Sequence, residues 1–187
     1  GVEQLVSVPE IRDSAITLTN AKIIAGPNIA DHAFAMLLAL TRQLVRTIPL
    51  QSRQDWNGAR AFPRIELNGR TAVVIGVGGI GMQIAQRAHA FGMRVIGVEP
   101  KDVPMILFLD RVVKPGRIDD DLPLADVVFM AAPHTKETDS LLDGRRFALM
   151  KQGAYFIAVS RGRTYSAAAL AEALDSKRLA GAGIDVV

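Results

Sequence analysis

The stretch Val73-Val74-Ile75-Gly76-Val77-Gly78-Gly79-Ile80-Gly81 decides the fold of this chain. An apolar run typical of a buried strand meets a cluster of glycines and continues into a helical pattern. Gly76, Gly78 and Gly81 have the spacing G-x-G-x-x-G. In that spacing the first glycine permits a tight turn, the second lets a phosphate approach the backbone, and the third lets the helix lie close to the strand. The alternative is a glycine-rich turn in an unrelated α/β protein, so the flanking residues have to decide.

The flanking residues predict a strand–helix–strand unit. One face of the helix after the glycines is apolar, at Ile80, Ile84, Ala85, Ala88 and Phe91. Gly92 suits the C′ position that ends a helix. A second strand follows at Arg94–Val98, and Glu99 then comes close to the roughly 20-residue offset expected of an acid that binds an adenosine ribose. The combination predicts a dinucleotide site, with the phosphates at the positive N-terminus of the helix.

Composition and charge narrow the class of protein. The chain has 187 residues, of which 49% are hydrophobic and 22% charged, as is typical of a soluble globular protein with a sizeable core. The net charge of +3 comes from scattered basic residues, so we expect no nucleic-acid partner. No apolar run reaches the roughly 18 residues that can span a membrane, and we expect no membrane partner.

The chain contains no cysteine. This excludes disulfides, thiolate nucleophiles and zinc–thiolate sites, and we predict no metal site. The cytoplasm is the expected compartment. The first residues, Gly1-Val2-Glu3-Gln4, do not have the pattern of a signal peptide.

From residue 71 onward, strand patterns alternate with helix patterns. Further strands are predicted at residues 111–113, 125–131, 154–159 and 182–187, and Ser166 is the expected N-cap of the last helix. The alternation predicts an α/β protein with a doubly wound parallel sheet and right-handed crossovers. We assign residues 27–187 to this dinucleotide-binding domain and residues 1–26 to the remnant of a second domain.

The segment Ala33–Leu40 is apolar on nearly every side. It predicts a helix, with Asn28 as its N-cap, that is buried under the sheet or in a subunit interface. His32 at its start is interpreted as facing a neighbouring domain or a partner, with a ligand or catalytic role as the alternative. Trp56, the single tryptophan, ends a short predicted helix and is expected to serve in packing.

Ligands of doubly wound sheets bind at the carboxyl ends of the strands. In this chain the residues at those ends are Gly76–Gly81, Glu99, Pro133–Thr135, Ser160–Gly162 and Asp185. We expect the site along this edge. His134, in the segment Pro133–Thr135, is interpreted as only lining the site.

With these residues in view, the chain resembles the D-isomer-specific 2-hydroxyacid dehydrogenase family over nearly its whole length. Several motifs in order carry the resemblance, and together they are far more specific than the glycine spacing alone. They are Thr19-Asn20-Ala21, Ile29–Ala33, Gly69-Arg70-Thr71 before the glycines, Pro133–Thr138, Met150–Ala154 followed by Ser160-Arg161-Gly162, and Leu179–Val186. The resemblance implies a Rossmann-type NAD-binding domain with a remnant of the substrate domain at the N-terminus.

The resemblance also implies a reaction, in which hydride passes between nicotinamide and C2 of a small 2-keto or 2-hydroxy acid. Arg161 matches the family's catalytic arginine, whose planar fork of donors can hold the substrate carboxylate and polarise the keto oxygen. Asp185 stands where the family's aspartate accepts hydrogen bonds from the nicotinamide carboxamide. The cofactor-binding residues expected in this way are Gly76, Gly78, Gly79, Ile80, Gly81, Glu99, Pro133, Thr135, Ser160 and Asp185.

Glu99 favours NAD over NADP, because a carboxylate accepts bonds from both ribose hydroxyls but repels a 2′-phosphate. Lys101, two residues on, is a mild argument for NADP. The family's catalytic glutamate and histidine have no counterpart in these 187 residues, so we expect this polypeptide to bind the nucleotide but to catalyse poorly by itself. Smaller departures are Asp31, where the family usually has glutamate, and Gly79, where a larger residue is common.

Two other functions stay open at this point. The same fold serves in non-enzymatic, corepressor-like proteins that sense NAD(H). A methyltransferase is the second alternative, although the three-glycine spacing and the motif around Arg161 argue against it. The resemblance further implies a homodimer. Glyoxylate, hydroxypyruvate and 3-phosphoglycerate derivatives all fit as substrates.

Overall fold

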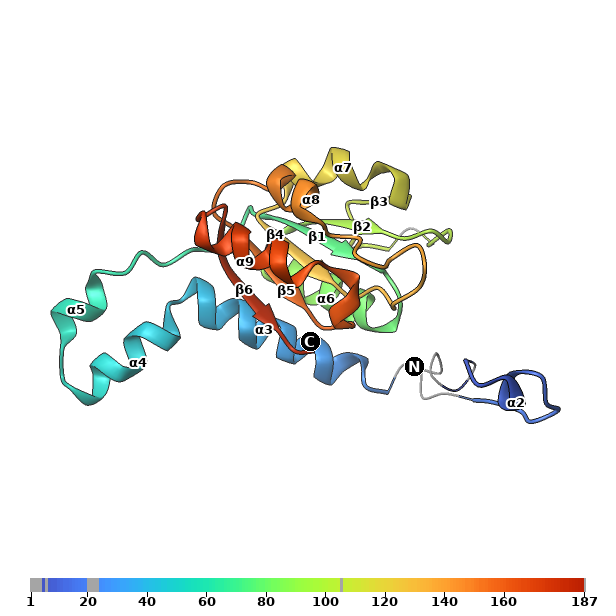
Figure 1. The fold of residues 1–187 in the computed structure, drawn as a ribbon. Coiled ribbons are helices and arrows are strands. Elements are labelled where there is room, and N and C mark those ends of the chain that lie inside the picture. The colour runs from blue at the N-terminus through green and yellow to red at the C-terminus, as the bar shows by residue number, and fades with distance from the viewer. Residues whose placement is uncertain (1–4, 6, 20–23, 105, 187) are drawn as a thin grey trace.

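The computed structural model describes residues 5, 7–19, 24–104 and 106–186 (Figure 1). Its body is a six-stranded parallel sheet with the strand order β3-β2-β1-β4-β5-β6. The strands are β1 (Thr71–Ile75), β2 (Arg94–Val98), β3 (Arg111–Val113), β4 (Val127–Met130), β5 (Ala154–Ala158) and β6 (Leu179–Ile184). This is the order of a doubly wound dinucleotide-binding sheet, in which the direction of winding reverses between β1 and β4. The predicted fold class is confirmed.

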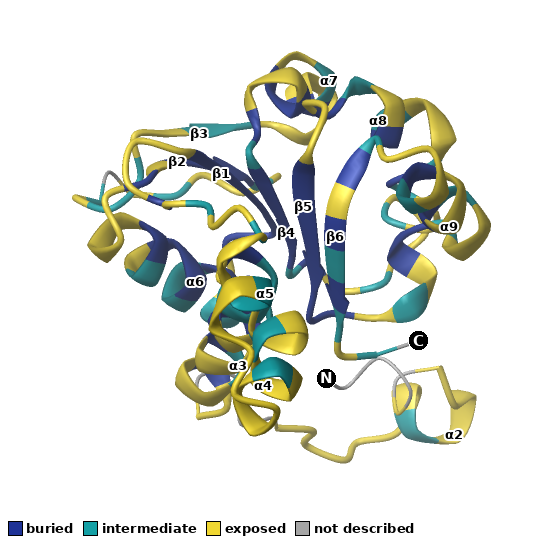
Figure 2. Cartoon of the chain, turned by 90° about the vertical axis from the view of Figure 1, so that its left-hand side faces the viewer, coloured by how far each residue is buried: buried dark blue, intermediate teal, exposed yellow. Residues whose placement is uncertain are grey.

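Helices cover both faces of this sheet (Figures 1 and 2). The helices are α2 (Pro9–Arg12), α3 (Gly26–Thr41), α4 (Leu44–Ser52), α5 (Trp56–Arg60), α6 (Gly79–Ala90), α7 (Ile118–Asp121), α8 (Gly144–Leu149) and α9 (Ala167–Asp175), with 3₁₀ turns η1 (Pro115–Arg117), η2 (Leu122–Leu124) and η3 (Gly162–Thr164). Part of one family motif, Asn20-Ala21, and residues 1–4 of the predicted remnant lie outside the described residues.

Alternate residues of the central strands face the two helix layers. Val74 and Phe129 belong to the core cluster under α3 and α6, whereas Val73 and Val128 belong to the cluster under α7, α8 and α9. Every residue of β1, β4 and β5 is therefore buried. Burial on both faces explains why these strands are apolar throughout instead of alternating between apolar and polar residues.

Several predicted element ends are wrong, and Trp56, predicted to end a short helix, instead begins α5. Helix α3 begins at Gly26 with Ala25 as its N-cap, so Asn28 lies inside the first turn and caps nothing. The sixth strand begins three residues earlier than predicted and ends at Ile184. The predicted N-cap Ser166 is confirmed, since its side chain accepts a hydrogen bond from the Ala169 N–H. Gly92 adopts a φ of 72° at the end of α6, as its predicted C′ role requires.

Helix α3 is buried on one side only. Ala33 and Leu37 are fully buried against α6 and the sheet, whereas Ala35 is exposed. The chain then leaves the body as an arm made of α4 and α5 (Figure 1). Trp56 on this arm is 75% exposed and does not pack against the body, so the expected packing role is wrong within this chain.

Among the described residues, no single helix is long and apolar enough to cross a membrane. Helices α3 and α4 pass the length and composition test only as a pair, and they meet at a bend of 66°. Helix α2 lies apart from the sheet at the end opposite the arm (Figure 1). The domain boundary near residue 26 stays a prediction.

Candidate functional site

The glycines in the loop between β1 and α6 have two different roles. Two of them are required by the fold, and one leaves the backbone open to a ligand. A Cβ on Gly76, whose φ is 88°, would lie 2.6 Å from both N and Cα of Ala132, and one on Gly81 would lie 1.8 Å from the Gly76 carbonyl oxygen. These two glycines are needed by the fold itself. A Cβ on Gly78 would meet nothing within 4 Å, so this position leaves the backbone open to a ligand.

Helix α6 begins directly at this open position. Its N-cap is Gly78, which has no side chain that could bond to the first N–H groups of the helix, and Gly79 and Ile80 form the first turn. Uncapped N–H groups and the helix dipole favour an anion at this end. The loop can therefore accept a pyrophosphate, as the sequence predicts.

Glu99 lies at the end of β2, beside the glycine loop. Its Oε2 accepts a hydrogen bond of 3.0 Å from the Val77 N–H, and its Oε1 accepts one of 3.3 Å from the Lys101 N–H. The backbone of Glu99 is held in turn, because its N–H donates to the Val113 carbonyl of β3. A fixed carboxylate next to a phosphate loop is the arrangement that a nucleotide ribose requires.

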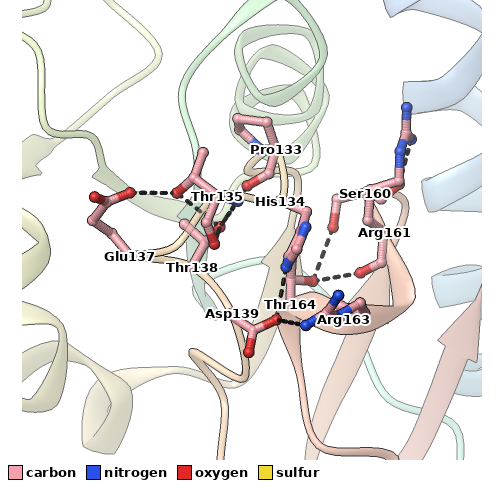
Figure 3. Close-up of polar contacts among 10 residues, drawn as sticks. All are labelled: Pro133, His134, Thr135, Glu137, Thr138, Asp139, Ser160, Arg161, Arg163 and Thr164. Carbon is pink, nitrogen blue, oxygen red and sulfur yellow. Dashed lines mark hydrogen bonds and ion pairs between the residues drawn. The ribbon is translucent and has the colours of Figure 1, made fainter. Parts of the chain in front are cut away.

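Asp139 ties together the loops that follow β4 and β5 (Figure 3). Its Oδ1 lies 2.7 Å from Nε2 of His134 and 3.1 Å from Nη2 of Arg163. The hydrogen bond with His134 and the charge of Arg163 hold the pKa of Asp139 below its ordinary value. The Ser140 N–H also donates to the Arg163 carbonyl, so the two loops form one rim of the site.

Within that rim, Pro133 and Thr135 are held by Thr138. The Thr138 hydroxyl donates to the Pro133 carbonyl at 2.7 Å and accepts a bond from the Thr135 N–H at 2.7 Å. The Thr135 hydroxyl donates to Glu137, which lowers the pKa of that carboxyl. The predicted cofactor residues of this loop therefore adopt a fixed conformation.

Ser160 and Arg161 follow β5 directly. Ser160 is buried, and its Oγ lies 3.2 Å from Oγ1 of Thr164. The Arg161 guanidinium donates one hydrogen bond of 2.7 Å to the Ser160 carbonyl and points away from the His134–Asp139 pair (Figure 3). Since a guanidinium has five N–H donors, this bond leaves donors for a carboxylate.

Asp185 follows β6, where its N–H donates to the Ala158 carbonyl. Oδ1 of Asp185 lies 3.3 Å from Nε2 of His32, which comes from the first half of α3. His32 thus contacts a carboxylate of its own chain, and because its side chain is still 52% exposed, the interpretation that it faces a neighbouring domain or a partner stays a prediction.

Sequence reasoning missed Thr138, Asp139, Arg163 and the pairing of His32. Thr138 could have been found, because it closes the Pro133–Thr138 motif. Among the described residues no group of three or more histidines and carboxylates could hold a metal ion. The carboxyl ends of all six parallel strands share one edge of the sheet, and the predicted residues from Glu99 to Asp185 follow the strands at that edge.

An open glycine at a helix N-terminus, a fixed acid after β2 and polar loops after β4, β5 and β6 define a dinucleotide-binding α/β protein. Residues 34–187 match the family described as D-isomer specific 2-hydroxyacid dehydrogenase, NAD binding domain. The chain belongs to this family and contains its NAD-binding domain, as the resemblance in the sequence implies. NAD is the cofactor of this domain.

Individual relatives agree with this assignment. The chain is similar to D-3-phosphoglycerate dehydrogenase of Bacillus subtilis, with 37% identity over 97% of this chain and 35% of that protein. A D-lactate dehydrogenase from Aquifex aeolicus, complexed with NAD and lactic acid, matches 84% of this chain and 47% of its own, with a TM-score of 0.75 and 34% identity. An acyclic imino acid reductase in complex with NADPH and D-Arg matches 94% and 56%, with a TM-score of 0.85 and 27% identity. The chain thus spans about a third to about half of the proteins it matches.

Proposed function

We propose that this chain binds NAD as part of an enzyme that transfers hydride between NAD and a small 2-hydroxy or 2-keto acid. In this proposal the pyrophosphate lies against Gly78 to Ile80, the adenosine ribose against Glu99, and the nicotinamide against Asp185. The observation that carries the proposal is the loop itself, since Gly78 is open at the N-cap of α6 and Glu99 is bonded to the same loop.

The chemistry of the proposed reaction needs a cation near the substrate. Oxidation of a 2-hydroxy acid moves a hydride from C2 to NAD and the hydroxyl proton to a base. In the proposal Arg161 binds the carboxylate of the substrate and polarises the oxygen on C2. Its bond to the Ser160 carbonyl supports this role, because the bond holds the guanidinium at the end of β5 without using all of its donors.

The homodimer is part of the same proposal. Leu44, Val45, Ile48 and Trp56 are all exposed and come from α4 and α5, and large exposed apolar surfaces often mark an interface. Val45→Asp would place a charge on this surface. We expect a dimer mass for the unchanged chain and a monomer mass for the variant in analytical ultracentrifugation. A monomer at every concentration for both would contradict the homodimer.

No observation favours the alternative of an NAD(H)-sensing corepressor-like protein. The cytoplasmic location and the lack of nucleic-acid and membrane partners stay predictions. The substrate class rests on the family, whose members named above act on different small acids.

The test of the function is a calorimetric titration of the folded chain with NADH and with NADPH. We expect saturable binding of NADH. NADPH should bind more weakly, if it binds at all, because in this proposal Glu99 faces the ribose. Preference for NADPH would overturn the assignment of Glu99. Circular dichroism and thermal unfolding show whether the chain is folded. If a folded chain binds neither nucleotide, the proposal as a whole is overturned.

A further inference from the structure

Helix α3 and strand β6 pack along two matched rows of residues. Gly181 and Gly183 lie two residues apart on one face of β6, and Asp185 follows the strand two residues later, with its N–H still bonded to the Ala158 carbonyl of β5. A Cβ on Gly183 would lie 2.8 Å from Cβ of Met36, and one on Gly181 would lie 3.1 Å from Cδ2 of Leu40. The two glycines therefore allow the helix to approach the strand more closely than any larger residue would.

The row on the helix has the same spacing as the row on the strand. Leu40, Met36 and His32 are four residues apart and lie on one face of α3. Four residues of helix rise about 6 Å and two residues of strand rise about 6.6 Å, so the rows stay in step over three contacts. After Leu40 on Gly181 and Met36 on Gly183, the third contact is His32 on Asp185, with Nε2 3.3 Å from Oδ1.

A second ion pair fixes how α3 is rotated. Asp31, the neighbour of His32, accepts a hydrogen bond of 2.7 Å from Nε of Arg87 on α6. Consecutive residues of α3 thus reach in different directions, one toward α6 and one toward β6. Rotation of the helix about its axis would break both contacts, so His32 is directed at Asp185 by the packing and not only by its own charge.

We propose that His32 is a positioning residue that orients the Asp185 carboxylate toward the nicotinamide carboxamide of NAD. The inference rests on the proposed function, in which Asp185 accepts that hydrogen bond. One oxygen of the carboxylate faces the imidazole, which leaves the other to the amide. Without His32 the side chain of Asp185, which is 40% exposed, is free to rotate into solvent. Loss of His32 then weakens only the part of binding that depends on nicotinamide.

The test compares NADH with ADP-ribose, which contains the adenosine, the pyrophosphate and the second ribose but no nicotinamide. Affinities of the 187-residue chain for both are measured by calorimetry. For His32→Ala we expect NADH affinity to fall by about two- to fivefold, the range of a partly exposed ion pair, with ADP-ribose affinity unchanged. His32→Gln keeps an N–H donor at a similar reach and is expected to restore most of the NADH affinity.

Two further variants make the outcomes distinct. Asp120→Asn is the control, because it removes an exposed ion pair, with Arg117, that takes no part in the packing of α3 and is expected to change neither affinity. If Asp185→Ala lowers NADH affinity and His32→Ala does not, the role of His32 is overturned and the proposed function stands. If Asp185→Ala leaves NADH affinity unchanged, the assignment of Asp185 fails and the inference fails with it. An equal loss for NADH and ADP-ribose in His32→Ala would mean that the residue only supports the fold, which also overturns the inference.

Discussion

Alanine at Gly78 and alanine at Gly81 are expected to have opposite effects on this protein. Gly78 has φ −81° and ψ −159°, a conformation that alanine adopts readily, and its Cβ would meet nothing within 4 Å. The substitution Gly78→Ala should leave stability unchanged or raise it by about 0.4–1 kcal/mol, because alanine restricts the unfolded chain. In the proposed site the new methyl group stands where the pyrophosphate approaches, so NADH affinity should fall by at least about tenfold, or about 1.4 kcal/mol.

Gly81→Ala places its methyl group against the backbone instead. Its Cβ would lie 1.8 Å from the Gly76 oxygen, and real Cβ contacts are essentially never below 3.0 Å, so α6 must move away from β1. Overpacking costs about 1–3 kcal/mol, and the upper end applies because neither backbone can rotate aside. At about 2–4 °C for each kcal/mol in a protein of this size, the midpoint of thermal unfolding should drop by about 6–12 °C.

The assay pairs thermal unfolding with NADH calorimetry on both variants. Gly116→Ala is the control, since its Cβ would also meet nothing within 4 Å but it lies in η1, outside the site. We expect the control to match the unchanged chain in both measurements. Wild-type NADH affinity in Gly78→Ala would refute the position of the pyrophosphate. If Gly78→Ala lost as much stability as Gly81→Ala, the claim that Gly81 serves the fold and Gly78 serves only the ligand would be refuted.

Three further perturbations test other parts of the structure. Glu99→Ala should lower the affinity for NADH and reduce the preference for NADH over NADPH, which titration with both nucleotides will measure. The pKa of Asp119 lies below its ordinary value because Arg146 donates a hydrogen bond to it, and that of Asp139 is lowered in the same direction. Both carboxylates therefore stabilise the fold above the unfolded-state pKa of about 3.9, and this contribution is lost as the pH falls below that value. The midpoint temperature of thermal unfolding should stay constant from pH 7 to about pH 5 and decrease below about pH 4. Phe129→Ala, at a fully buried ring, should destabilise the fold by about 3–5 kcal/mol in urea unfolding.

The parts of the fold that could be predicted from the sequence are those whose causes are local. Val73–Gly81 contains the strand, the turn and the start of the helix within nine neighbouring residues, and each glycine has a separate steric reason. The family motifs likewise place their residues at strand ends, and parallel strands bring those ends to one edge. Local patterns therefore sufficed for the fold class and for the strand order along which the predicted site residues lie.

The predictions that failed depend on contacts between distant segments. The start of β6 was missed because Gly181 and Gly183 weaken its strand pattern, and an irregularity between Ala154 and Tyr155 shifts its register against β5. The partner of His32 is a residue near the other end of the chain, which the helical pattern around His32 cannot indicate. Trp56 is exposed because α4 and α5 leave the body, and an apolar residue in a short helix does not reveal whether its own chain covers it.

In the proposed site, Glu99 selects NAD with a side chain that the backbone holds in place. The Val77 and Lys101 N–H groups hold the carboxylate in place, so little conformational entropy is left to lose when a ribose binds. A carboxylate has about four lone-pair positions, and two hydrogen bonds from the backbone leave room for both ribose hydroxyls. A 2′-phosphate would meet the same carboxylate as a second negative charge, and two N–H groups offset only part of that repulsion. In the proposed site, the glycine loop therefore binds the pyrophosphate and, through the Val77 N–H, also holds the carboxylate that selects the ribose.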